Sequence, residues 1–214
     1  MENQVELIDS LYRRAAAFAT FLLLYNIIEG AVAIFMGISD ESLTLFGFGI
    51  DSLVEVASNL GVIYMIRRIR QNPNSDRTVF ENSALRITGY GFLVLALILL
   101  IGVVFTFIEN HRPETTTWGI VISLFSIIIM YYVLTSQIKI GKALNSQPII
   151  SDAKCTMVCV YMSIVLLLSS FVYETTGFAY SDVLGALGLI YFSLREGKEA
   201  LYKAKGKECT DNCC

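Results

Sequence analysis

The segment ITGYGFLVLALILLIGVVFTFI, residues 87–108, decides the fold of this chain. It carries no charged residue, and it is uninterruptedly apolar from Phe92 to Ile101. A helix needs about 20 mostly apolar residues to cross a bilayer. A strand of a membrane β-barrel would instead alternate apolar and polar residues over about 10 positions. The segment therefore predicts a transmembrane α-helix.

Further apolar runs of similar length lie on both sides of this one. The six predicted spans are Ala15–Ile38, Leu43–Ile66, Ile87–Ile108, Trp118–Ile138, Ile149–Tyr173 and Phe178–Leu194. We expect an all-α integral membrane protein built as a six-helix bundle, with no soluble C-terminal domain. Residues 1–14 form an N-terminal segment, 15–205 the transmembrane domain and 206–214 a Cys-rich tail. The first run is too long for the core of a cleaved signal peptide, so we expect it to remain.

The composition supports this class of protein. Hydrophobic residues make up 55% of the chain and charged residues only 16%, and the mean hydropathy is +0.61. Soluble domains carry about 25% charged residues, which they need to cover a water-exposed surface. The net charge is −3, and no basic block stands apart from an apolar run. Nucleic-acid binding is therefore not expected.

The distribution of Lys and Arg predicts the topology. With both termini inside, 15 of the 16 basic residues fall in inside segments, and only Arg112 falls outside. The positive-inside rule then places both termini in the cytoplasm. We expect an integral protein of the cell membrane, the inner membrane if the host is prokaryotic.

Polar residues within two of the spans point to chemistry. Asp51 and Glu55 lie four residues apart in the second span, and Cys155 and Cys159 lie four apart in the fifth. Each pair occupies one face of a helix, and the two spans run in opposite directions. If the helices pack side by side, Asp51 meets Cys159 and Glu55 meets Cys155. Two carboxylates and two thiols then converge near mid-membrane.

This set of ligands predicts a metal site. Zn²⁺ takes four ligands in a tetrahedron and accepts both thiolate and carboxylate, whereas Mg²⁺ and Ca²⁺ prefer oxygen alone. A pair of cysteines by itself is more typical of helix packing, because Cys behaves as a small hydrophobe. Carboxylates at membrane depth are costly and mark functional positions. The expected substrate is Zn²⁺, Cd²⁺ or Hg²⁺, with no permanently bound cofactor.

Three other polar residues are candidates for an accessory metal or proton path. Asn26 and Glu29 share one face of the first span, and the helical rise puts Glu29 at about the height of Asp51. Glu29 is a candidate transient ligand or proton acceptor, or a structural hydrogen-bond partner. Asp182, near the outer end of the sixth span, either lines the exit path or caps a helix.

Cysteines and one histidine outside the spans complete the candidates. Cys209, Cys213 and Cys214 lie in the tail, where a reducing cytoplasm argues against disulfides. They form either a flexible arm that captures soft metals or a terminus without function. The lone His111 lies in an outer loop, where a surface histidine is usually incidental.

Two motifs resemble those of the cation diffusion facilitator family. Residues 51–55, DSLVE, resemble its second-helix metal motif, and residues 151–159, SDAKCTMVC, resemble its fifth-helix motif. Residues 181–188, SDVLGALG, are similar to its small-residue-rich sixth helix. The resemblance covers about residues 12–205. It implies a six-helix, homodimeric transporter that exports divalent transition metals by alternating access, usually in exchange for protons.

The chain departs from the family pattern at three points. Glu55 stands where the family usually has a second Asp, and Cys155 and Cys159 stand where it has His and Asp. The thiols make the site softer. The family's usual cytoplasmic domain is not expected in this sequence, so a dimer would form through the membrane helices.

Two other function classes stay open. One is a metal importer or passive conductor built on the same site, and the other is a membrane metal sensor or partner subunit that does not transport. The sequence holds no phosphate-binding GxxxxGK[ST] motif and no HExxH or Ser-His-Asp arrangement. An enzyme is therefore not expected.

Overall fold

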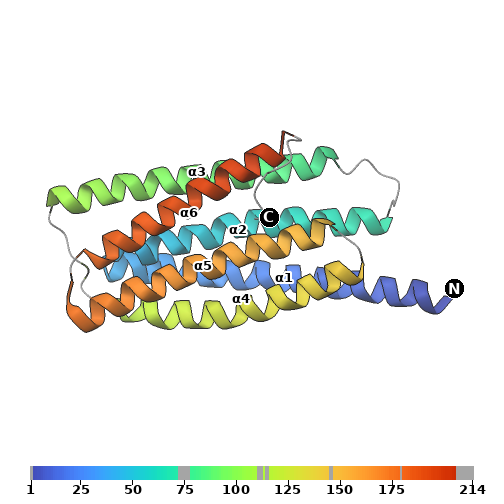
Figure 1. Ribbon diagram of the computed structural model, residues 1–214, viewed down its shortest axis with the longest axis horizontal. Helices are drawn as coiled ribbons and strands as arrows, with labels where there is room; N and C mark the ends of the chain where they lie inside the picture. The colour runs from blue at the N-terminus through green and yellow to red at the C-terminus, as the bar shows by residue number, and fades with distance from the viewer. Residues whose placement is uncertain are drawn as a thin grey trace.

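A computed structural model of the chain describes residues 2–71, 78–109, 113, 116–144, 147–178 and 180–205. Within these ranges the protein is helical and contains no strand (Figure 1). The helices are α1 (Glu2–Ser39), α2 (Leu43–Gln71), α3 (Thr78–Glu109), α4 (Thr117–Ala143), α5 (Gln147–Thr176) and α6 (Ser181–Lys203). Each contains one of the predicted spans or nearly all of it, and most extend beyond it into charged sequence. The all-helical prediction is confirmed.

Five of these helices are long and apolar enough to cross a membrane. Among the described residues the spanning segments are Ser10–Ser39, Leu43–Gly61, Leu85–Ile108, Thr117–Ala143 and Thr156–Thr176. Helix α6 forms where a sixth span was predicted, but it does not meet the same criterion. Its second half carries Arg195, Glu196, Lys198 and Glu199, and Asp182 lies in its first turn.

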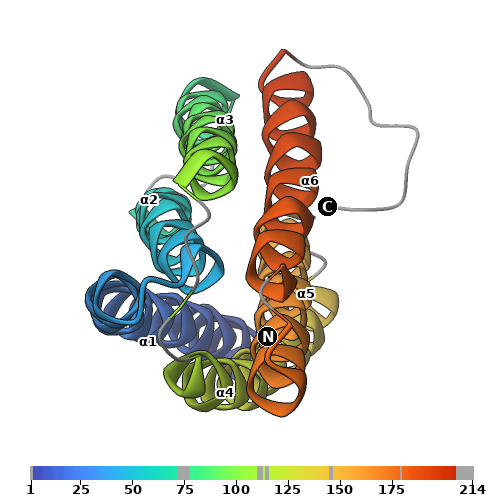
Figure 2. The ribbon, with the colours of Figure 1, turned by 90° about the vertical axis from the view of Figure 1, so that its left-hand side faces the viewer.

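The helices run roughly along one long axis (Figure 1), and neighbours in sequence run in opposite directions. The most extensive contacts join α1 to α2, α4 to α5 and α3 to α6, and α2 also contacts α5 and α6 across the bundle. Figure 2, seen along this axis, shows α3 and α6 paired on one side and α1 and α4 on the other, with α2 and α5 between them. Helix α2 therefore lies between α1 and α3 and also contacts α5 and α6, so its polar face is shielded.

Glycines allow α1 and α2 to approach closely. A Cβ atom built on Gly49 would lie 2.7 Å from the backbone nitrogen of Ile34 and 3.0 Å from the carbonyl oxygen of Gly30. A Cβ on Gly37 would lie 2.5 Å from the backbone nitrogen of Phe46. Small residues at such positions let helix backbones pack tightly in a membrane. The close approach brings polar side chains of α1 within hydrogen-bonding distance of α2.

Candidate cation site

The two acidic residues of α2 both face the interior of the bundle. Asp51 is 1% exposed and Glu55 is 8% exposed, as the four-residue spacing on one helical face requires. Among the described residues no donor reaches Oδ1 of Asp51. A buried carboxylate oxygen without a donor costs about 1–3 kcal/mol or more in lost solvation. Such an oxygen is well suited to bind a cation.

Asn26 of α1 contacts Glu55, the second of these two carboxylates. Its Nδ2 donates a 3.0 Å hydrogen bond to Oε2 of Glu55, and its side chain is fully buried. The other end of the amide, Oδ1 of Asn26, meets no donor in the described part of the chain. The two oxygens without a donor, on Asn26 and Asp51, are thus both acceptors on the α1–α2 face.

Glu29 of α1 lies one turn further along, at the level of Asp51. Its Oε1 accepts a 2.7 Å hydrogen bond from the Tyr25 hydroxyl, and its Oε2 accepts one of 3.1 Å from Ser52. Ser52 directly follows Asp51, and Glu29 is only 5% exposed. The relative heights of Asn26, Glu29 and the α2 carboxylates therefore match the spacing calculated from the helical rise.

Small hydroxyl side chains extend this polar group to α4 and α5. Ser126 of α4 lies near both Tyr25 and Glu29. Ser163 of α5 donates a 2.7 Å hydrogen bond to the Cys159 carbonyl of its own helix, and its hydroxyl oxygen lies 3.0 Å from that of Ser126. Polar side chains thus connect four helices in the interior of the bundle. Such connections are typical of the interior of membrane bundles, where no water is present to satisfy polar groups.

The predicted cysteines are only partly placed. Cys159 is buried, and it packs with Met130 and Val160 against the Tyr25 ring. Tyr25 in turn donates to Glu29, so it links this cysteine to the α1 side of the polar group. The side chain of Cys155 lies outside the described residues. Among the described side chains, no three His, Cys, Asp or Glu residues are close enough together to hold a metal ion. The four-ligand cage stays a prediction.

Asp182 of α6 caps the N-terminus of α2. Its Oδ2 accepts a 2.8 Å hydrogen bond from the Leu43 amide, and its Oδ1 accepts bonds of 2.7 Å from Ser42 and 3.2 Å from the Thr44 amide. The first amides of a helix lack partners within the helix and carry a partial positive charge, which a carboxylate neutralises. The side chain therefore joins α6 to α2 and caps a neighbouring helix rather than its own.

Several members of this site were missed in the sequence. Glu196 of α6 is buried and lies within electrostatic range of Asp51. It lies two residues beyond Leu194, the last residue of the predicted sixth span, so the span prediction does not include it. Ser126 and Ser163 gave no signal, because a serine in a membrane helix is common and only packing shows which ones meet. His111, Cys209, Cys213 and Cys214 lie outside the described residues.

Buried acidic side chains gather where α1 faces α2. Three buried carboxylates, from Glu29, Asp51 and Glu55, lie on the facing surfaces of α1 and α2, and the buried Asn26 adds an amide oxygen. Acidic side chains this deep in a membrane bundle are expensive unless a partner balances them. A divalent cation would supply that balance.

The model of one protein family matches the chain. The match is to the cation efflux transmembrane domain, and it covers residues 16–205, from the start of the first apolar run to the end of the described chain. This range contains all the acidic residues and the two membrane cysteines discussed above. The chain therefore belongs to the cation diffusion facilitator family and comprises its cation efflux transmembrane domain.

Proposed function

We propose that this cation efflux transporter exports a thiophilic divalent cation, Zn²⁺, Cd²⁺ or Hg²⁺, bound by Asp51, Glu55, Cys155 and Cys159. The observation that carries the proposal is the burial of Asp51 and Glu55 on one face of α2, with Oδ1 of Asp51 lacking a donor among the described residues. Helix α5, which contacts α2, carries both cysteines. Thiolate ligands favour soft cations over Mn²⁺, Mg²⁺ and Ca²⁺.

The membrane topology belongs to this proposal. We infer that α6 crosses the bilayer as the sixth span and that both termini are cytoplasmic. Helix α6 pairs with α3 along much of its length, and Asp182 ties it to the outer end of α2. The described basic residues at the other end include Arg13, Arg14, Arg67, Lys139 and Lys142, as the positive-inside rule requires.

Alternating access with proton exchange is the proposed mechanism. A thiol binds metal as a thiolate, so metal entry expels protons, and protons returning from outside favour release. Glu29 is the proposed accessory acceptor, because its carboxylate contacts Ser52 beside Asp51 and yet lies on a different helix. Relative movement of α1 and α2 would change these contacts. A homodimer formed through the membrane helices is part of the same proposal.

One observation favours a second candidate substrate. Asn26 and Asp51 each have an oxygen without a donor among the described residues, and the nearby acids are Glu29 and Glu55. Helices α1 and α2 alone therefore offer a ligand set made entirely of oxygen. Cys159 packs in an apolar cluster with Met130. Oxygen ligands suit Mn²⁺ and other hard cations. An α1–α2 site of this kind would carry a harder cation than a site that uses both thiols.

The decisive experiment is metal flux in proteoliposomes loaded with a metal-sensitive dye. Proton-dependent flux of Zn²⁺ or Cd²⁺ supports the exchanger, and flux without proton dependence indicates a passive conductor. Tight binding without flux indicates a sensor. The direction of metal movement against a set pH gradient separates export from import.

Asp51→Asn tests the site within this assay. The change keeps the size of the side chain and removes its charge, so flux should fall at least tenfold while the protein remains folded and extractable. Glu174→Gln is the matched control, since Glu174, near the end of α5, accepts a 2.6 Å hydrogen bond from the Thr116 amide, and an amide oxygen can accept the same bond. Wild-type flux in Asp51→Asn would contradict the proposal.

A further inference from the structure

A long groove runs between α1 and α4 on the outside of the bundle. It has a volume of about 920 Å³, within the size range of sites that hold small molecules. Its walls are mostly apolar, and two basic residues lie among them. The residues used below are Arg14, Phe18, Phe21, Tyr132, Ser136 and Lys139.

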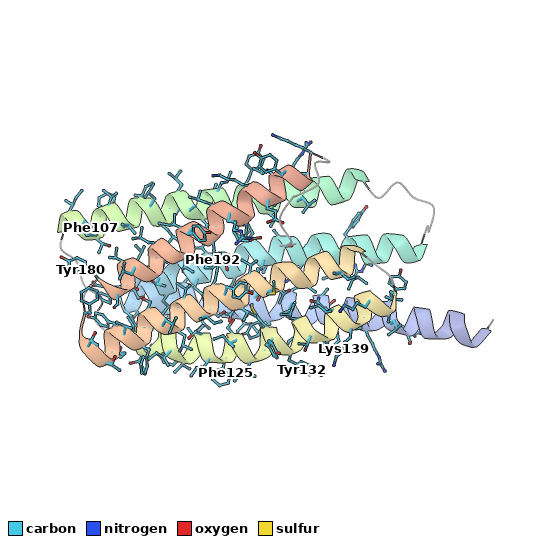
Figure 3. The ribbon with its side chains drawn as sticks, viewed as in Figure 1. Phe107, Phe125, Tyr132, Lys139, Tyr180 and Phe192 are labelled. Atoms are coloured by element: carbon cyan, nitrogen blue, oxygen red, sulfur yellow. The ribbon has the colours of Figure 1, made fainter. Side chains whose placement is uncertain are left out.

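The two basic residues mark one end of the groove. Helices α1 and α4 run in opposite directions, so Arg14, in the first half of α1, and Lys139, near the end of α4, line the same end of the groove. Figure 3 labels Lys139. Both side chains are exposed. In the described part of the chain no carboxylate pairs with either of them. Two cations at one end of an apolar channel suit an anion with an apolar extension.

The groove as a whole has about the length of one bilayer leaflet. From Lys139 back to Ile128 the α4 wall rises about 16 Å at 1.5 Å per residue. Half of a hydrocarbon core of about 30 Å is about 15 Å. Phe18 and Tyr132 meet edge to face within the groove, with ring centroids 6.3 Å apart, and Ser136 lies one turn beyond Tyr132 toward the basic end. The groove is thus apolar at one end and basic at the other, which matches the acyl chain and the charged head group of a lipid.

We propose that this groove binds an anionic phospholipid, with its phosphate held by Arg14 and Lys139 and an acyl chain lying along Phe21 and Ile128. Basic pockets between transmembrane helices on the cytoplasmic side are suited to anionic head groups. Arg offers a planar fork to a phosphate, and Lys adds a second positive charge. On the topology proposed above, this end of the bundle lies in the cytoplasmic leaflet, where anionic lipids are concentrated.

A second copy of the chain is a poorer occupant. In a symmetric dimer across this groove, each copy would present the same end of the bundle to the other. That end carries the described residues Arg13, Arg14, Arg67, Lys139 and Lys142, so like charges would face one another and repel. An anionic lipid neutralises the same charges instead.

Quenching of tryptophan by brominated lipids tests the proposal in the intact chain. The sequence has one tryptophan, Trp118, at the far end of α4. Trp118→Phe combined with Tyr132→Trp places a single indole in the groove. Trp118→Phe with Phe125→Trp is the matched control, because Phe125 is exposed on the same helix but does not line the groove (Figure 3). Both proteins are reconstituted in mixed vesicles in which either the anionic or the zwitterionic lipid is brominated.

The indole at 132 should show a preference for the anionic lipid of roughly tenfold or more, the size expected for two basic groups at a membrane surface, and the indole at 125 should show none. Arg14→Gln with Lys139→Gln should abolish the preference. Arg67→Gln with Lys142→Gln removes the same charge outside the groove and should preserve it. Equal quenching by both lipids at 132, or a preference that survives Arg14→Gln/Lys139→Gln, would overturn the proposal. No quenching at 132 by either lipid would mean that protein covers the groove, which also overturns it.

Discussion

Nδ2 of Asn26 donates a 3.0 Å hydrogen bond to Oε2 of Glu55, and this bond joins α1 to α2 at a depth where both side chains are buried. The NH₂ group of the Asn26 side chain is thus bonded to the Glu55 carboxylate, whereas Oδ1 of Asn26 has no donor among the described residues. The residue therefore holds Glu55 in place while offering an oxygen of its own. A single amide can therefore both position Glu55 and supply an oxygen ligand.

The first prediction concerns this bond. Asn26→Leu keeps the approximate size of the side chain and removes the donor to Glu55, so the free energy of unfolding should fall by about 1.5–3 kcal/mol, the value of a hydrogen bond to a charged group. In a Glu55→Leu background the same change should cost much less, since no carboxylate remains to be satisfied. Denaturant titration in detergent measures the four proteins of the cycle. Ser123→Ala, which removes a hydroxyl bonded within its own helix at Ile120, is the control. Equal costs of Asn26→Leu in both backgrounds would show that the bond contributes no coupling energy.

The second prediction concerns Glu29. Glu29→Gln retains an oxygen that accepts from Tyr25 or Ser52 but cannot ionise. We expect the protein to stay folded, and metal flux to lose most of its dependence on the proton gradient. The measurement is flux at several imposed pH gradients, with Glu174→Gln as a control on the outer surface. If flux and its pH dependence match the wild type, Glu29 is a structural hydrogen-bond partner only.

The third prediction concerns selectivity. If both thiols bind the substrate, wild type should prefer Cd²⁺ over Mn²⁺ by at least tenfold, and Cys155→His with Cys159→Asp should shift the preference toward harder cations. Competition flux with the two ions at equal concentration measures it. Cys213→Ser, measured separately, shows whether the tail contributes to the preference. A wild type in which Mn²⁺ competes as well as Cd²⁺ would favour the α1–α2 oxygen site over the thiol site.

The fourth prediction concerns the cap on α2. Asp182→Ala removes the acceptor for the Leu43 and Thr44 amides and the Ser42 hydroxyl, so stability should fall by about 1–3 kcal/mol. Ser181→Ala, the adjacent residue, loses only a local bond to the Phe178 carbonyl and should change stability by far less. Denaturant titration of both variants tests this difference. Asp182→Ala with unchanged stability but lost flux would instead place Asp182 on the exit path.

The sequence by itself determined the class of the protein, the number of helices and the family. An apolar run such as 87–108 is stable in lipid. There its backbone must satisfy its hydrogen bonds within a helix. The spacing of Asp51 and Glu55 fixed their common face, because the helical period is set by backbone geometry. The heights of Asn26 and Glu29 followed from the constant helical rise.

Only the tertiary structure decided which of these faces meet. Glycines at 30, 37 and 49 let α1 pack closely against α2. Asn26 therefore contacts Glu55, and Glu29 contacts Ser52. The spacing of residues within either helix does not predict these contacts between helices. Likewise, Asp182 caps α2 from another helix, and Glu196 turns inward beyond the predicted end of its span. Contacts between helices depend on rotation and tilt, which are set by the packing of small side chains rather than by hydropathy.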